Sequence, residues 1–356
     1  MNLKTDICSL FDIEFPIIQA GMAGGITTPE LVAAVSDAGG LGTLAAGYLT
    51  PDGTREAIRK IRERTDRPFS VNLFRVEMEQ EDQGTASVQE KLLSIYEDLG
   101  ISPTTGKPKV KDYYEEQFDL LIEERVPVIS TTFGVPDKEQ VRRAHEHGLK
   151  LVTMVTTVKE AIQADEVGVD SVVAQGGEAG GHRGTFDVID GKGAAIGTFA
   201  LIPQVVDHVS IPVIAAGGIM DGRGLVAARA LGADGIQLGT RFLNAVESGT
   251  DPAYKKELLE SDEESTEITT AFSGRPARAI RNRFMGFLKA NQIEPHSYPI
   301  QNLITKEIRA AAKQQGKAEY LSLWSGQGNR LIKEGQTAEE IIKEIITEAE
   351  KTMGQL

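Results

Sequence analysis

The sequence predicts an α/β protein that closes into a (β/α)8 TIM barrel and carries an added, mainly helical C-terminal insertion domain. Eight short runs are almost continuously apolar, which is typical of parallel strands buried on both faces. Helical patterns separate many of these runs, and glycines cluster after several of them, as a ring of loops at one barrel face requires. An open doubly wound sheet is the alternative, but it predicts an early GxGxxG motif with a following acidic residue, and the sequence has none.

The expected strands and helices alternate along the first two-thirds of the chain. The strands are Pro16–Gly21, Leu41–Gly47, Phe69–Phe74, Val126–Phe133, Lys150–Val155, Ser171–Gln175, Pro212–Gly217 and Gly235–Gly239. The helices between them include Pro29–Ala38, Asp52–Arg64, Lys138–His147 and Val158–Glu166. The first of these helices starts well, because the hydroxyl of Thr28 can cap it and Pro29 fits its first position.

Two segments exceed a minimal barrel. Val76–Glu116 follows the third strand and is polar, charged and partly helical, and Asn244–Arg330 follows the eighth strand. Thr337–Met353 has apolar residues at helical spacing, so we expect it to close the barrel as its last helix. We therefore predict a barrel over residues 1–243 with an insertion at 76–116, a helical lid domain over 244–330, and a C-terminal helix within 331–356 that returns to the barrel.

The composition excludes several classes of function. Asp and Glu number 52 against 38 Lys and Arg, a formal charge of −14, which argues against a nucleic-acid partner because phosphate binding needs a basic surface. Cys8 is the one cysteine, so neither an internal disulfide nor a cysteine metal cluster can form. The N-terminus does not resemble a signal peptide and no apolar run is long enough to span a membrane, so we expect a soluble cytoplasmic protein.

Glycine-rich segments after the seventh and eighth strands predict a phosphate site. Gly217 and Gly218 follow the seventh strand, and Gln237-Leu238-Gly239-Thr240 spans the end of the eighth. Loops after these two strands commonly bind phosphate in this type of barrel, because glycines let backbone N–H groups approach the anion. Tight turns with close strand–helix packing are the alternative explanation.

Polar residues at the ends of other strands predict a planar heterocyclic ligand. Asn72 lies near the end of the third strand and Gln175 ends the sixth, and amides in apolar strands must find partners. Ala20-Gly21-Met22 follows the first strand and could bring its backbone against a flat ring. Phosphate and ring together suggest a mononucleotide such as FMN, with a phosphorylated substrate as the rival and internal hydrogen bonds as the alternative role of the amides.

The loop from Gln175 to Gly184 places His182 among five glycines, including Gly180 and Gly181. A histidine titrates near neutral pH and can move protons, so we interpret His182 as a catalytic base, although it could simply cap backbone groups of its loop. Arg183 either fixes the loop or meets an anion, and Glu178 is open to the first of these roles. No second histidine or carboxylate has ligand spacing near His182, so no metal site is predicted.

Together these residues resemble the nitronate monooxygenase family, formerly called 2-nitropropane dioxygenases. The resemblance rests on PIIQAGMAGG, AQGGEAGGHRG, PVIAAGGIMDGRG, GADGIQLGTRF, AFSGRPAR and WSGQG, and it spans nearly the whole chain. It implies a barrel that binds FMN without a metal or nicotinamide requirement. It also implies that O2 and an alkyl nitronate, such as propionate 3-nitronate, react to give a carbonyl compound and nitrite, and that this reaction serves detoxification.

The resemblance assigns roles to individual residues. His182 matches the base of the family, and the phosphate of FMN would lie at Gly217, Gly218, Gly239 and Thr240. The implied FMN contacts as a whole are Ala20, Gly21, Met22, Asn72, Gln175, Gly180, Gly181, Gly217, Gly218, Gln237, Leu238, Gly239 and Thr240. An anionic substrate would suit Arg183 or the basic run Arg275–Arg283, which could equally be a solvated face. The chain could also form a homodimer.

Two other functions remain open. The related FMN-dependent enoyl-acyl-carrier-protein reductase II shares the barrel, the phosphate loops and a histidine loop, but takes hydride from NAD(P)H to reduce a fatty enoyl thioester. A flavin-binding barrel without catalytic activity is the third reading, and a titratable histidine would be needless there.

Overall fold

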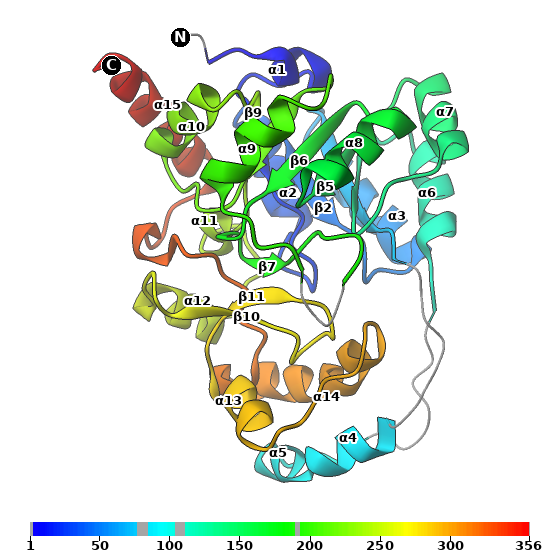
Figure 1. The fold of residues 1–356 in the computed structure, drawn as a ribbon, viewed down its shortest axis with the longest axis vertical. Coiled ribbons are helices and arrows are strands. Elements are labelled where there is room, and N and C mark those ends of the chain that lie inside the picture. The colour runs from blue at the N-terminus through cyan, green and yellow to red at the C-terminus, as the bar shows by residue number, and fades with distance from the viewer. Residues whose placement is uncertain (1–2, 77–84, 104–110, 189–192, 356) are drawn as a thin grey trace.

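The computed structural model describes residues 3–76, 85–103, 111–188 and 193–355. Eight parallel strands form one sheet in the order β1-β9-β8-β6-β5-β4-β3-β2, and a parallel bridge between Ile18 and Leu41 joins its two ends. The strands are β1 Ile17–Gln19, β2 Gly42–Ala45, β3 Phe69–Phe74, β4 Val128–Thr132, β5 Lys150–Val155, β6 Ser171–Gln175, β8 Val213–Ala216 and β9 Gly235–Leu238. The predicted (β/α)8 barrel is therefore confirmed (Figure 1).

Each expected strand contains one observed strand, and the differences lie at the ends. The third, fifth and sixth strands have the expected bounds, whereas the first ends before Gly21 and the second before Gly47. Likewise, Gly217 and Gly239 lie just beyond β8 and β9. These glycines leave the hydrogen-bonded ladder and build the loops at the carboxyl ends of the strands, where function is located in this fold.

Helices surround the barrel and separate most successive strands. They are α2 Pro29–Asp37, α3 Pro51–Arg62, α6 Tyr114–Glu123, α7 Lys138–Glu146, α8 Val158–Val167, α9 Thr198–Val206, α10 Gly222–Ala230 and the short α11 Thr240–Leu243. The hydroxyl of Thr28 accepts a hydrogen bond from the backbone N–H of Leu31, as expected for the cap of α2. Capping boxes at Asp137 and Thr157 start α7 and α8 in the same way.

The C-terminal helix α15 Ala338–Met353 packs against α10 and α2. It buries Ile341, Ile342 and Ile345 in the layer between the strands and the surrounding helices. The contact with α10 is close, since a Cβ on Gly222 would lie 2.2 Å from the backbone nitrogen of Ala349. The apolar face of this helix therefore packs on the barrel, as expected from the sequence.

The barrel interior has its own apolar core. Ile18, Leu41, Val152 and Ile214 point into it from different strands, and α1 Asp6–Phe11 adds Ile7, Cys8 and Phe11. In Figure 1, α1 lies at the top of the molecule, at the opposite end of the barrel from β7 Gly181–His182. One end of the barrel is thus plugged by apolar side chains, and the other is left for a site.

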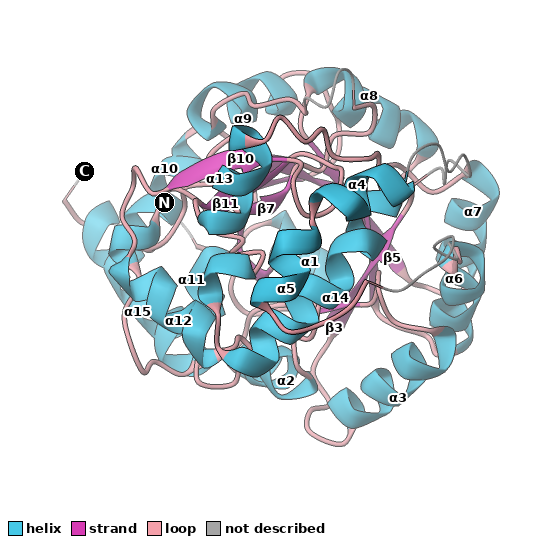
Figure 2. Ribbon diagram, turned by 90° about the horizontal axis from the view of Figure 1, so that it is seen from below, coloured by secondary structure: helices cyan, strands magenta, loops and turns pink. Residues whose placement is uncertain are grey.

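A second unit lies below the barrel in Figure 1. It comprises α12 Pro252–Glu260, β10 Thr266–Thr269, β11 Ala277–Ile280, α13 Arg283–Ala290, α14 Ile300–Gln315 and the 3-10 turns Ala318–Tyr320 and Asn329–Leu331. Its core includes Leu258, Phe272, Phe284 and Ile304. Figure 2, drawn from below, shows α14 and α5 Leu93–Asp98 lying across this end of the barrel.

The insertion after β3 contributes to the core of this second unit. Helices α4 Thr85–Lys91 and α5 place Leu92 and Ile95 in the same apolar cluster as Phe284 and Ile304. The predicted insertion Val76–Glu116 also includes residues 77–84 and 104–110, which lie outside the described residues. The domain boundaries given above remain a prediction, but the described helices of the insertion pack with the second unit.

The second unit is mainly helical but contains a small antiparallel sheet. β10 pairs with β11, and β11 pairs with β7, so that Ala277 stands opposite His182. The sequence did not predict this sheet, because strands of four and two residues are too short for a recognisable period. The sheet matters because it connects the histidine loop to the second unit.

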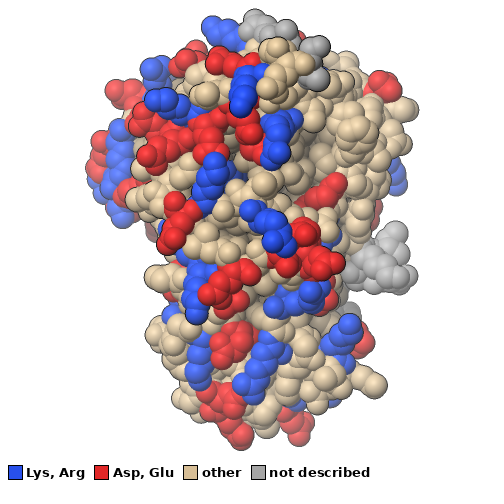
Figure 3. Space-filling view, turned by 90° about the vertical axis from the view of Figure 1, so that its left-hand side faces the viewer, with Lys and Arg blue, Asp and Glu red and all other residues tan. Residues whose placement is uncertain are grey.

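Two surface properties complete the description. Lys and Arg side chains are interspersed with Asp and Glu across the face drawn in Figure 3. Ion pairs near the surface, such as Lys333–Glu344, bring opposite charges together. None of the helices in the described ranges combines the length and the hydropathy that crossing a membrane requires.

Candidate active site at the carboxyl ends of the strands

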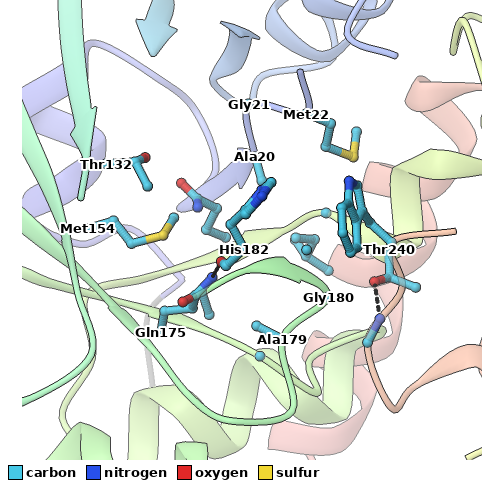
Figure 4. A pocket seen from close by; sticks show the side chains of 18 of the residues that line it. Ala20, Gly21, Met22, Thr132, Met154, Gln175, Ala179, Gly180, His182 and Thr240 are labelled. Carbon is cyan, nitrogen blue, oxygen red and sulfur yellow. Dashed lines mark hydrogen bonds between the residues drawn. The ribbon is translucent and has the colours of Figure 1, made fainter. Parts of the chain in front are cut away.

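A pocket of about 1090 Å3, part of it open to solvent, lies at the carboxyl ends of the barrel strands. Its wall comes from the loops after β1, β6, β8 and β9, from strands β3 to β5, and from Trp324, Gly326 and Gly328 of the second unit. The structure places every predicted site residue in this wall: Ala20, Gly21, Met22, Asn72, Gln175, Gly180, Gly181, His182, Gly217, Gly218, Gln237, Leu238, Gly239 and Thr240 (Figure 4).

Unpaired backbone donors gather where β8 and β9 end. Among the described residues, the N–H groups of Gly217, Gly218, Gly239 and Thr240 have no hydrogen-bond acceptor. Gly217 and Gly218 have φ values of 114° and 69°, which other residues rarely adopt. Gly217 and Gly239 are half-buried and Gly218 is exposed, so these donors can be reached from the pocket. Clustered backbone N–H groups of this kind bind anions such as phosphate.

Thr240 links these donors to the second unit. Its hydroxyl oxygen accepts a hydrogen bond of 3.0 Å from the backbone N–H of Gly326, so its own hydrogen can still be donated into the pocket. Gly326 also packs against the histidine loop, because a Cβ there would lie 2.7 Å from the carbonyl oxygen of Glu178. The backbone of the second unit at Gly326 therefore lies directly against the backbone of the histidine loop.

Asn72 forms the opposite wall of the pocket, on β3. Its Nδ2 donates hydrogen bonds of 3.0 Å to Ser130 Oγ and 3.1 Å to Thr132 Oγ1. A Cβ on Gly21 would lie 2.9 Å from the Cβ of Asn72, so the loop after β1 can pass close to this strand because residue 21 is glycine. The amide is held in a fixed orientation beside the backbone of Ala20 and Met22.

Gln175 braces the histidine loop. Its Nε2 donates a 3.0 Å hydrogen bond to the carbonyl oxygen of His182, and its Oε1 accepts one of 2.9 Å from the N–H of Gly184. The internal hydrogen bond considered as an alternative role of this amide is therefore present. The second hydrogen on Nε2 is still available to a ligand in the pocket.

Arg183 is fully buried and does not line the pocket. Its guanidinium donates to the carbonyl oxygens of Gln175, Gly176 and Ala194 at 2.7, 2.8 and 2.9 Å. Burial lowers the pKa of Arg183 to about 10. Of the two roles open to Arg183, the structure supports loop fixation. It gives no support to contact with an anionic substrate, because the side chain is fully buried and lines neither cavity.

Glu178 also serves the loop. Its carboxylate accepts hydrogen bonds from the backbone N–H and the hydroxyl of Thr198, at the start of α9. A carboxylate near a helix N-terminus is favourable because unpaired N–H groups and the helix dipole face it. Together, Gln175, Arg183 and Glu178 anchor the loop to β6 and α9.

His182 stands in the wall of the pocket between aromatic rings. The centroid of its ring lies 5.8 Å from that of Phe133 and 5.1 Å from that of Trp324. Nε2 lies 2.8 Å from the hydroxyl oxygen of Ser273, which belongs to the second unit. Burial, followed by the positive charges of Arg275 and Arg309, lowers the pKa of His182 to about 3. The imidazole is therefore neutral at physiological pH, as a base must be before it accepts a proton.

The arginines of the basic run Arg275–Arg283 line neither cavity, and they differ in exposure. Arg275 is buried and Arg278 is half-buried, whereas Arg281 and Arg283 are exposed to solvent. Arg275 is 8% exposed, donates to the carbonyl oxygens of Thr185 and Phe186, and stacks over Phe133 at 4.2 Å. Arg278 donates to the carbonyl oxygen of Gly177, and Arg283 forms an ion pair with Asp98 at 2.7 Å. The expectation that this run receives the substrate directly is therefore wrong, although Arg275 acts on His182 through its charge.

A second cavity of about 1860 Å3, also partly open to solvent, adjoins the first. The residues that line both cavities are Ala23, Ile26, Tyr48, Phe74, His182 and Trp324. One face of α14 lines the second cavity with positive charge, since Lys306, Arg309 and Lys313 follow one another at helical spacing. His182 thus stands where the two cavities meet.

The sequence did not identify the partners that the second unit supplies. Ser273 lies in the AFSGRPAR segment and Trp324 in WSGQG, both noted as motifs without a role for either residue. The spacing of Lys306, Arg309 and Lys313 was present in the sequence, but an exposed basic helix face is ordinary. Only the packing of α14 over the barrel turns this face toward a cavity.

No group of three or more His, Cys, Asp or Glu side chains could hold a metal ion within the described ranges. His145 contacts Asp170 at the surface, and His147 and His208 each contact a carbonyl oxygen of their own helix. None of these three histidines lines either cavity, so we assign them no part in the site.

Comparison with known proteins agrees with the site. The family model described as nitronate monooxygenase matches residues 4–348. A probable nitronate monooxygenase of Staphylococcus saprophyticus is 42% identical over 357 residues, covering 100% of both chains. A protein of the same name from Staphylococcus aureus is 42% identical over 354 residues, covering 98% of each chain.

Solved structures give the same picture. Nitroalkane oxidase from Streptomyces ansochromogenes is 39% identical, superposes with a TM-score of 0.91, and is matched over 98% of this chain and 99% of its own. FabK from Thermotoga maritima is 32% identical with a TM-score of 0.78, over 99% and 98% of the two chains. The similarity in fold and sequence is thus greater to the nitroalkane oxidase.

Proposed function

Since the chain belongs to the nitronate monooxygenase family, we propose that it uses FMN and O2 to convert alkyl nitronates into carbonyl compounds and nitrite. It is an enzyme, a nitronate-oxidising flavin-dependent oxidoreductase, as its relatives indicate. The observation that carries the finer proposal is the position of His182, between a pocket with unpaired backbone donors and a second cavity lined by cations.

The first pocket suits FMN in the chemical groups that line it. The unpaired N–H groups of Gly217, Gly218, Gly239 and Thr240 would hold the phosphate, and Thr240 could add its hydroxyl. Asn72, Gln175 and the backbone of the loop after β1 would hold the ring and the ribityl chain. Bound there, FMN would supply the electron acceptor for the nitronate and the route of electrons to O2.

The second cavity supports a negatively charged substrate. Lys306, Arg309 and Lys313 carry positive charge on one wall, and with Lys111 they outnumber the lining carboxylates Asp112 and Asp251. Tyr48, Phe74 and Trp324 add aromatic surface next to His182. A nitronate is itself an anion, and propionate 3-nitronate adds a carboxylate that the α14 wall would attract. Detoxification of such compounds is the biological role that fits this substrate.

His182 would act on neutral nitroalkanes more than on nitronates. A neutral nitroalkane must first lose a proton from the carbon that bears the nitro group, and a neutral imidazole in the pocket wall can accept it. A nitronate has already lost this proton, so its oxidation needs the base less. The family resemblance and the geometry therefore both support a larger role of His182 with neutral nitroalkanes than with nitronates.

Anaerobic stopped-flow spectroscopy of the purified, FMN-loaded protein tests the proposal. We expect propionate 3-nitronate alone to bleach the flavin absorbance quickly and nitrite to appear when oxygen is admitted. Fast bleaching by NADH alone would instead support the enoyl reductase. A protein that stays colourless after incubation with FMN would overturn the cofactor assignment and favour a phosphorylated substrate.

A further inference from the structure

The hydroxyl of Ser273 contacts three groups at once, and one of them is the imidazole of His182. Ser273 Oγ lies 2.8 Å from His182 Nε2, accepts a 3.2 Å hydrogen bond from the backbone N–H of Arg275, and lies 3.2 Å from the carbonyl oxygen of Arg275. Ser273 is 2% exposed, so water cannot easily replace any of these partners. A single hydroxyl hydrogen must therefore choose between His182 Nε2 and the carbonyl oxygen.

The two choices leave His182 in different tautomers. If the serine hydroxyl donates to Nε2, the ring proton must be on Nδ1, and the carbonyl oxygen of Arg275 loses the serine as a donor. If Nε2 carries the proton, it donates to Ser273 Oγ, which then donates to the carbonyl oxygen of Arg275. The second arrangement uses all three contacts as hydrogen bonds, which is favoured in a buried site.

The other ring nitrogen, Nδ1, faces accessible space. No described residue forms a hydrogen bond with His182 Nδ1, and this atom is not one of the buried side-chain atoms without a partner. His182 itself lines both cavities. Nδ1 is thus the nitrogen that a substrate can reach, while Nε2 points to the second unit.

We infer that Ser273 is a positioning residue that keeps the proton of resting His182 on Nε2, so that the lone pair of Nδ1 faces the substrate. This inference rests on the proposed function, since it names the atom that serves as the base. The arrangement resembles the orienting partner of other catalytic histidines, which fixes the tautomer without reacting itself. Here a neutral hydroxyl and a backbone carbonyl take that role in place of a carboxylate.

The proton transfer balances without a further reactant. The carbon–hydrogen bond next to the nitro group breaks, its electron pair remains on the substrate as the nitronate anion, and the proton forms a bond to Nδ1. The imidazolium then keeps its Nε2–H donated to Ser273 Oγ, which passes the polarisation to the carbonyl oxygen of Arg275. Arg275 and Arg309 are the charged groups that act on this ring, and the nitronate anion formed beside it offsets their effect on the imidazolium.

Nitrogen-15 NMR of histidine-labelled protein reads the tautomer directly and does not depend on activity. We expect the resting, FMN-loaded enzyme to show His182 protonated on Nε2, with the signal identified by its loss in His182→Asn. In Ser273→Ala we expect a mixture of tautomers or a shift to Nδ1–H, and in Ser273→Thr, which keeps a hydroxyl, the original tautomer. Wild-type protein with the proton on Nδ1 would overturn the inference without any variant at Ser273.

Kinetics with two substrates adds a second readout. Ser273→Ala should lower kcat for a neutral nitroalkane about 10- to 100-fold while changing kcat for the matching nitronate less than about twofold, and Ser273→Thr should recover most of the difference. Ser248→Ala is the matched control, because Ser248 accepts a 3.2 Å hydrogen bond from the N–H two residues on, as Ser273 does, but contacts no histidine. Equal losses on both substrates in Ser273→Ala would overturn the positioning role. No flavin reduction by either substrate in wild type would instead refute the proposed function and leave the tautomer to be judged by NMR alone.

Discussion

The two sides of the site differ in the chemical groups that they offer. The barrel side presents backbone N–H groups at Gly217, Gly218 and Gly239 and amides on strands, all fixed by the sheet. The second unit presents side chains, namely the hydroxyl of Ser273, the ring of Trp324 and the cations of α14. This difference indicates that backbone groups held by the barrel suit a cofactor that stays bound. Side chains of the second unit can differ by substitution and can therefore set the reactivity of His182 and the choice of substrate.

Breaking the contact between the two sides should have the largest effect. A Cβ on Gly180 would lie 2.4 Å from the backbone nitrogen of Gly326 and 2.5 Å from the carbonyl carbon of Ser325. Because backbone atoms cannot yield as a flexible side chain can, we expect Gly180→Ala to weaken FMN binding at least about 10-fold and to lower the free energy of unfolding by about 1–3 kcal/mol. Fluorescence titration with FMN and chemical denaturation measure the two effects.

Gly286→Ala is the matched control for Gly180→Ala. Gly286 lies on an exposed face of α13, and nothing is within 4 Å of the position of its Cβ. Alanine is the better helix former, so this variant should be neutral or more stable by about 0.5–1 kcal/mol. FMN affinity retained by Gly180→Ala would show that the two sides do not need close backbone contact.

The next largest effect should follow from removing the hydroxyl of Thr240. Thr240→Val leaves the N–H of Gly326 without its acceptor and removes a donor from the proposed phosphate site, so we expect the Kd for FMN to rise about 10-fold. Thr269→Val serves as the control, because it removes a similar hydroxyl that accepts the N–H of Ala271 outside the pocket. An unchanged Kd in Thr240→Val would mean that Thr240 holds the second unit but not the cofactor.

Smaller and more selective effects are expected from the α14 wall. Lys306→Gln and Lys313→Gln should each raise KM for propionate 3-nitronate about 3- to 10-fold at low salt. KM for ethyl nitronate, whose side chain is uncharged, should hardly change. Lys289→Gln on α13, whose side chain lines neither cavity, should change neither value. A similar rise in KM for both nitronates would argue that the second cavity does not recognise the remote carboxylate.

A further test concerns the dependence of the free energy of unfolding on pH. His182 has a pKa of about 3 in the folded protein against an ordinary value of 6.5, so below pH 6.5 the unfolded chain binds more protons at this residue. Stability at this site is fully present above pH 6.5 and is lost as the pH falls toward 3, by about 2 kcal/mol between pH 7 and pH 5. Denaturation of wild type and His182→Asn at both pH values measures the difference. Equal pH dependence in the two proteins would contradict the lowered pKa.

The barrel side was largely predictable from the sequence, and the second side was not. Continuously apolar runs, which indicate burial on both faces, located the strands. Glycines at the strand ends marked the loops, because residues other than glycine rarely adopt φ values such as those of Gly217 and Gly218. Ser273, by contrast, lies 91 residues from His182 in the chain and reaches it through the pairing of β11 with β7. Two-residue and four-residue strands leave no period in a sequence, so no local signal could have placed this hydroxyl.

The roles of the arginines show the same limit. Arg183 and Arg275 are positive in the sequence and could each have bound a substrate anion, but the structure uses their donors on carbonyl oxygens. Whether a buried arginine is a ligand-binding or a structural group depends on which acceptors the fold brings to it. For Arg275 that information is in the packing of the second unit against the histidine loop, and for Arg183 it is in the fold of that loop itself.

Rates of flavin reduction by ethyl nitronate and by neutral nitroethane, compared between wild type and His182→Asn under anaerobic conditions, test the central claim most directly. We expect the substitution to slow reduction by nitroethane about 10²- to 10⁴-fold, the usual contribution of a general base, and reduction by the nitronate less than about 10-fold. Equal losses on the two substrates would contradict the assignment of His182 as the base that acts on the neutral substrate.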